Sequence, residues 1–176
     1  IGYWKNWNSC TGGGQDDTLA AVWPGPIYLG LLGIGDEEGN PDCETAVRVL
    51  DKSKTTTGEK WASNAAAGLA AQLLAYRLNR TEVWGAPPRG DSDLAAAAAH
   101  ELLTIVGYNG YEVNDQYPAY REQLNYLAGV LDDFNNNTLS FGYELPSPLP
   151  GEPSSAPAKT KVPKSDRGGG PKPKTR

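Results

Sequence analysis

The sequence has little of what enzyme sites usually require: its 176 residues include no methionine, two cysteines and one histidine, His100. A serine or cysteine nucleophile would need that single imidazole beside it, and the sequence contains no G-x-S-x-G turn. The histidine follows a run of alanines in an expected helix, where a structural or surface role is favoured over a general base. We therefore predict that the protein is not an enzyme. An enzyme of unrecognised type, with two carboxylates that the fold brings together, stays as an alternative.

Long apolar runs are absent as well. No run of about 18 apolar residues occurs, so the sequence predicts no membrane-spanning helix. A chain that starts at Ile1 and contains no methionine is typical of a mature product whose signal segment has been removed. We therefore expect a secreted protein, located outside the cell or on its surface.

The two cysteines, Cys10 and Cys43, stand 33 positions apart and form no C-x-x-C pair. This spacing is not that of a zinc site, and one disulfide between them is the preferred interpretation. Two small buried thiols in a reducing cell are the alternative. A disulfide would indicate an oxidising, extracellular compartment.

Charges of opposite sign lie in different parts of the chain. The whole chain has a net charge of −5, whereas the stretch from Pro146 onward has seven basic and two acidic residues and a net charge of +5. The rest of the chain therefore carries −10. Because the stretch after Pro146 is rich in proline and poor in apolar residues, it favours extended backbone and cannot form a core of its own. We predict two parts, a folded domain over 1–144 and an extended tail over 145–176.

A neighbouring copy of the acidic domain is the expected partner of the tail, so we predict a homo-oligomer or polymer. A solvated linker is the alternative. Nucleic acid is not expected, because the domain is acidic and no aromatic residue lies among the lysines. The tail residues expected to contact the partner are Lys159, Lys161, Lys164, Arg167, Lys172, Lys174 and Arg176.

Apolar residues recur at helical spacing in four segments, over 42–53, 61–79, 91–108 and 117–137. A shorter helix over 16–23 is indicated by its acidic start. Asp42 is the expected N-cap of the first long segment, and Pro118 fits the first turn of the last. In the segment 91–108 the expected core stripe is Leu94, Ala98, Leu102, Ile105 and Val106.

Residues 25–35 are apolar but interrupted by glycines, which favours a strand or a buried loop over a helix. Together the segments predict a mainly α protein, an irregular bundle of four or five helices. An aromatic segment precedes this bundle and the extended proline-rich tail follows it.

The opening stretch GYWKNW places three aromatic rings, Tyr3, Trp4 and Trp7, close to the start of the chain. We expect these rings to clamp the N-terminal segment onto the bundle, because exposed rings there would be sticky. Two alternatives are an exposed platform for sugar rings and a contact with the next subunit. Burial separates them, since a ring less than about a tenth exposed cannot be a platform.

The loop GDEEGNPDCE gathers hard oxygen donors, which suit Ca²⁺, although their spacing is not that of an EF-hand. An exposed acidic turn that caps the next helix is the preferred interpretation. The candidate calcium ligands are Asp36, Glu37, Glu38, Asn40 and Asp42.

The chain contains an ordered series of motifs: GYWKNW and the SC that follows, then CETAVRVLDKS, TGEKWASNAAAGLAAQLLAYRLN and LDDFNNNTL. This series, over about residues 2–139, resembles a domain of secreted bacterial proteins that open with GYWKNW or GFWKNW. The resemblance implies an extracellular compartment and a fold family, and it implies no reaction. Further cysteines belong to that pattern, yet WGAPPRGDSD and TLSFGYELP contain none here. The chain keeps one cysteine pair where the pattern suggests two.

These observations predict a secreted, non-enzymatic structural or adhesive subunit. It is expected to assemble with itself into a fibre or surface layer through its tail. A carbohydrate-binding surface module that uses exposed tryptophan or tyrosine, with a polysaccharide as partner, is the alternative. Calcium is the one cofactor suggested.

Overall fold

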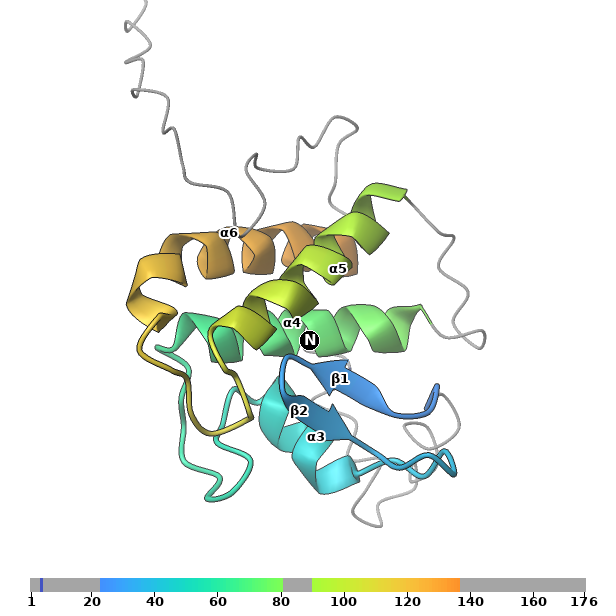
Figure 1. Ribbon diagram of the computed structural model, residues 1–176. Helices are drawn as coiled ribbons and strands as arrows, with labels where there is room; N and C mark the ends of the chain where they lie inside the picture. The colour runs from blue at the N-terminus through green and yellow to red at the C-terminus, as the bar shows by residue number, and fades with distance from the viewer. Residues whose placement is uncertain (1–3, 5–22, 81–89, 137–176) are drawn as a thin grey trace, which may run out of the picture.

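The computed structural model describes residues 4, 23–80 and 90–136, and the statements that follow refer to these. They form a short β-hairpin and four helices, so the prediction of a mainly α bundle is confirmed (Figure 1). The elements are β1 (Ile27–Leu29), β2 (Leu32–Ile34), α3 (Cys43–Leu50), α4 (Ala65–Asn79), α5 (Gly90–Ile105) and α6 (Tyr117–Asn135). Residues 16–22 of the expected first helix lie outside the described part.

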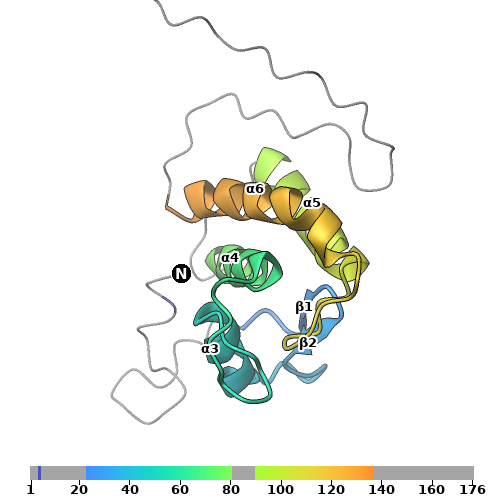
Figure 2. The ribbon, with the colours of Figure 1, turned by 90° about the vertical axis from the view of Figure 1, so that its left-hand side faces the viewer.

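Helix α4 is the centre of the bundle. It packs against α6 and α5 on one side and against α3 and β1 on the other (Figure 2). Its buried residues cover nearly the whole circumference of the helix rather than one stripe. Ala66, Ala70, Ala71 and Ala75 are fully buried, and such small side chains let neighbouring helices approach closely. None of the described helices is long and apolar enough to cross a bilayer.

Side chains accept hydrogen bonds from free N–H groups at the starts of α3 and α4. Asp42 accepts a hydrogen bond from Thr45 N (3.1 Å) at the start of α3, as the sequence predicts. Asn64 Oδ1 accepts from Ala66 N and Ala67 N at 2.9 and 3.1 Å at the start of α4. The Tyr117 hydroxyl accepts from Ala65 N at 3.0 Å, so the first residue of α6 holds the first turn of α4. Pro118 occupies the first turn of α6.

The stretch 25–35 is an antiparallel hairpin in which Ile27 pairs with Ile34 and Leu29 with Leu32. Gly30 turns the chain with a φ of +65°, and a Cβ there would come within 2.8 Å of the Leu103 backbone. Leu31 N donates to Tyr108 O at 2.9 Å. The hairpin is therefore held against α5 and the loop that follows it.

The expected core stripe of α5 is wrong at Leu94, and Ile105 is only partly buried. Leu94 is 56% exposed, whereas Ala95 and Ala99 are fully buried beside Leu102 and Val106. The run of alanines lets α5 approach its neighbours on an alanine face, and this closer packing rotates the larger Leu94 outward. The remaining buried residues of the helix follow helical spacing.

Candidate functional site

A chain of hydrogen bonds joins the N-terminal segment, α4 and α6. Trp4 Nε1 donates to Asn79 Oδ1 at 2.8 Å, and Asn79 Nδ2 donates to Asn135 Oδ1 at 3.0 Å. Asn135 Nδ2 donates to Gln72 Oε1 at 2.9 Å, and Gln72 Nε2 donates to Asp132 Oδ1 at 2.6 Å. We call these five residues the polar chain.

Members of the polar chain come from three of the motifs quoted above: Trp4 from GYWKNW, Gln72 and Asn79 from the alanine-rich motif, Asp132 and Asn135 from LDDFNNNTL. Trp4 is 3% exposed and packs in the core, so its ring is not available as a platform for a ligand. The indole N–H meets Asn79, the last residue of α4, and the clamp stays a prediction. Tyr3 and Trp7 lie outside the described residues.

His100 takes part in the packing of the hairpin. Its Nδ1 lies 3.3 Å from Gly30 N, which donates to it, and 3.2 Å from Tyr28 O. Thr104 Oγ1 donates to the His100 backbone oxygen at 2.9 Å. This geometry places the only histidine of the chain between α5 and the β-turn, where it joins the two.

The acidic loop is shaped by hydrogen bonds within it. The Asp36 carboxylate accepts from Asn40 Nδ2 at 2.9 Å and from Asn40 N at 2.8 Å. These bonds hold the pKa of Asp36 below its usual value, because they stabilise its charged form. Asp42 is occupied as the cap of α3. Among the described residues, no three His, Cys, Asp or Glu side chains gather as a metal site, and calcium stays a prediction.

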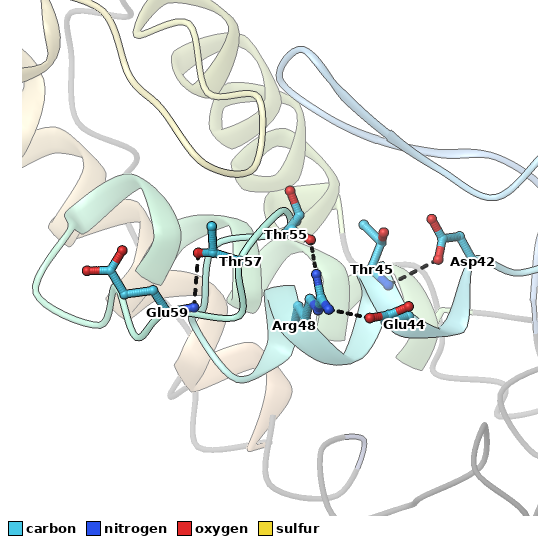
Figure 3. A network of polar contacts seen from close by, with 7 residues as sticks. All are labelled: Asp42, Glu44, Thr45, Arg48, Thr55, Thr57 and Glu59. Atoms are coloured by element: carbon cyan, nitrogen blue, oxygen red, sulfur yellow. Dashed lines mark hydrogen bonds and ion pairs between the residues drawn. The ribbon is translucent and has the colours of Figure 1, made fainter.

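The side of the molecule around α3 pairs its charges locally (Figure 3). Arg48 donates to the backbone oxygen of Thr55 and forms an ion pair with Glu44 one turn earlier. Two further ion pairs belong to the loop after α3: Lys54 with Glu59 at 2.7 Å, and Lys60 with Asp51. Over residues 23–80, seven acidic residues accompany six basic ones, which leaves this part almost neutral.

Residues 90–136 are strongly acidic. They contain eight acidic residues and one basic residue, Arg121, which gives a net charge of −7. At the start of α5, Asp93 forms an ion pair with Arg80 at 3.4 Å. Near the junction of α5 and α6, four exposed carboxylates form no ion pair with another described residue. They are Glu101, Glu112, Asp115 and Glu122, which we call the acidic end.

Two buried tyrosines stay protonated in the folded protein. The Tyr76 hydroxyl lies 2.7 Å from Asp93 Oδ1, to which it donates, and 2.8 Å from Ser92 Oγ. Burial raises the pKa of Tyr76 to about 12. Burial also raises the pKa of Tyr108. Both rings contribute to the packing of α4 and α5 rather than to an open cleft.

Among the described residues, several large apolar side chains are exposed on the hairpin and near the acidic end. Tyr28 is 50% exposed and Leu31 62% exposed at the hairpin, while Tyr111 and Tyr126 are each 38% exposed near the acidic end. The sequence offered the aromatic residues of GYWKNW as a ligand platform only as an alternative to the clamp, and it did not single out these tyrosines. Tyr28 stands between Ile27 and Leu29, so a strand assignment over this stretch would have placed its ring on the opposite face from theirs.

Cys43 is the first residue of α3 and packs half-buried against the core. Cys10 and the seven basic residues of the tail lie outside the described residues, so the disulfide and the tail contacts stay predictions. Comparisons with known protein families, with curated proteins and with solved structures found no match. The resemblance to GYWKNW-type secreted domains also stays a prediction, and function has to be argued from the surface of this chain.

Proposed function

We propose that the protein is a secreted, non-enzymatic structural subunit that binds other copies of itself through residues 146–176. One observation carries the proposal. The tail has a net charge of +5, and residues 90–136 of the same chain have a net charge of −7 with a single basic residue. Opposite charges on separate parts of one chain favour contact between copies, because each copy has a basic tail and an acidic region that can attract the tail of another copy.

The tail needs a surface to become ordered. It contains too few apolar residues to form a core, and its prolines favour an extended backbone that can lie along a partner. Lysine and arginine on such a strand are attracted to carboxylates on the partner. Salt screens this attraction, with a screening length of roughly 10 Å at 0.1 M ionic strength. Association through the tail should therefore weaken at high ionic strength.

The positions of the polar side chains support a structural role over a catalytic one. His100 joins α5 to the hairpin, Asp36 and Asp42 shape the acidic loop, and Asp132 belongs to the polar chain. Each of these groups has a hydrogen-bonding task within the bundle.

Sedimentation velocity and electron microscopy test the proposal. The full chain should form oligomers or filaments at low salt that shrink at 1 M salt, about the concentration at which the screening length falls to 3 Å. A full-length variant with the seven tail lysines and arginines replaced by glutamine should stay monomeric while its circular dichroism and melting temperature are unchanged. Unchanged assembly of that variant would refute the proposal.

A second candidate, binding of polysaccharide, is favoured by the position of Tyr28. Its ring lies against Gly33 of the neighbouring strand, with Cε1 3.3 Å from where a Cβ of Gly33 would be, and half of the residue stays exposed. A ring supported from one side can stack on a sugar. Retention on immobilised polysaccharide that is lost in Tyr28→Ala and kept in Leu31→Ala would support this candidate, whereas equal retention of both variants would contradict it.

A further inference from the structure

We infer that the acidic end, formed by Glu101, Glu112, Asp115 and Glu122, is the surface that receives the tail of a neighbouring copy. This inference rests on the proposed function and names the acceptor surface that the function requires. It comes from the placement of unpaired charges, from the direction of α6 and from the exposed tyrosines beside these carboxylates.

The four carboxylates lie at one end of the bundle. Glu101 stands four residues before the end of α5, and Glu122 stands five residues after the start of α6. At about 1.5 Å of rise per residue, both lie within about 8 Å of the helix ends that the connecting loop joins. Glu112 and Asp115 belong to that loop. The end of α5 and the start of α6 lie on the left in Figure 1.

These carboxylates differ from the paired acidic residues around α3, although Glu37 and Glu38 of the acidic loop also form no ion pair within the described residues. Around α3, Glu44 and Glu59 each have a basic partner. At the opposite end of the α5–α6 layer, Asp132 accepts a hydrogen bond from Gln72. Within the described ranges, the acidic end has four exposed carboxylates and no ion pair, so a cationic strand would find charges of opposite sign there.

The direction of α6 separates the acidic end from the origin of the tail. The 19 residues of α6 span about 28 Å, and the chain continues toward the tail from Asn136, at the end of α6 that is far from Glu122. The five prolines over residues 146–158 favour an extended backbone before the first basic residue of the tail. A tail that starts at one end of the molecule and an acidic end at the other favour a head-to-tail contact between copies.

Two tyrosines give the acidic end an apolar component. Tyr111 precedes Glu112 directly, and Tyr126 follows Glu122 by one helical turn; each is 38% exposed. Proline-rich strands dock on aromatic surfaces because their preformed backbone loses little entropy on binding. The tail, in which prolines alternate with lysines toward its end, matches a surface that combines tyrosine rings with carboxylates.

Zero-length cross-linking locates the contact. A carbodiimide activates a carboxylate, and a lysine amine in contact with it then forms an amide bond. With an equal mixture of ¹⁴N- and ¹⁵N-labelled full-length protein, we expect cross-linked peptides of mixed label that join Lys159–Lys174 to residues 101–122. Cross-links confined to one label would show that the tail folds back on its own copy and would overturn the head-to-tail contact.

Charge reversal tests the same surface in solution. The full-length variant Glu112→Lys/Glu122→Lys should associate about tenfold more weakly, since two exposed ion pairs of up to about 0.7 kcal/mol each correspond to that factor. The control Glu37→Lys/Glu38→Lys makes the same charge change at two exposed residues of the acidic loop and should associate as the wild type does. Adding Lys159→Glu/Lys161→Glu to the first variant should restore association.

The outcomes separate the two proposals. If removal of the tail charges abolishes association but both acidic variants associate equally well, the proposed function stands and the acidic end is refuted as the acceptor. If removal of the tail charges has no effect, both fail. A loss of association in the Glu112/Glu122 variant that the reversed tail does not rescue would also refute the direct contact.

Discussion

Replacement of Trp4 tests whether the N-terminal segment is held by the bundle. A buried tryptophan removes roughly 150–250 Å² from water, and Trp4 is 3% exposed. At about 25 cal/mol per Å² this corresponds to about 4–6 kcal/mol as an upper value. We expect Trp4→Ala to lower the free energy of unfolding by about 3–5 kcal/mol, measured by urea denaturation with circular dichroism. Tyr111→Ala, at an exposed ring, is the control and should change it by less than about 0.5 kcal/mol.

The hydrogen bond of the indole can be separated from its burial. Trp4→Phe keeps an aromatic ring but leaves Asn79 Oδ1 without its donor, which costs about 1–3 kcal/mol. A double-mutant cycle with Asn79→Ala should give a coupling energy of about 0.5–1.5 kcal/mol. A loss below about 1 kcal/mol in Trp4→Ala would show that the ring does not hold the segment in place, and the clamp would have to be abandoned.

Three further expectations follow from the packing. Gly30→Ala should destabilise the fold by at least about 2 kcal/mol in urea, because its φ is +65° and Leu103 leaves no room for a Cβ, whereas Gly68→Ala, with open space in α4, should stabilise it by about 1 kcal/mol. The free energy of unfolding should fall as the pH rises from about 10 to 12, since Tyr76 keeps its proton in the folded state while the unfolded tyrosine loses it. In Tyr76→Phe the fall in the free energy of unfolding should be smaller by up to about 1.4 kcal/mol per pH unit. Thiol alkylation of the unreduced, denatured protein should label neither Cys10 nor Cys43, and reduction should lower stability by about 3 kcal/mol; labelling of both would refute the disulfide.

Local signals in the sequence were sufficient for the helices with clear ends. Asp42 caps α3 and Pro118 begins α6 as predicted, because both act through their own residues and their nearest neighbours. The hairpin could not be distinguished from a buried loop, since its strands are three residues long and depend on Leu103 and Tyr108, far along the chain. The orientation of α5 could not be read from its alanines, which are alike on every side of the helix.

The polar chain and the acidic end could be identified only from the fold, for a similar reason. Composition predicts an acidic domain and a basic tail, but it does not say which carboxylates already have partners. Asp132 meets Gln72 only because α6 lies along α4, and Glu122 lacks such a partner although it lies on the same helix. Asn79 and Asn135, at the ends of two apolar helices, were the signal available for the polar chain, because a polar residue there must find a partner when it is covered.

The enclosure of α4 determines how the chain can be divided. A helix that is buried around nearly its whole circumference has little surface suited to water, so separating the two sides of the bundle would expose apolar surface of α4. A protease cut or a genetic split between α3 and α6 would therefore produce two aggregating fragments rather than two smaller domains. Inserted sequences should preserve the fold only at the outer loops. Thermal unfolding of the bundle should occur in one cooperative step.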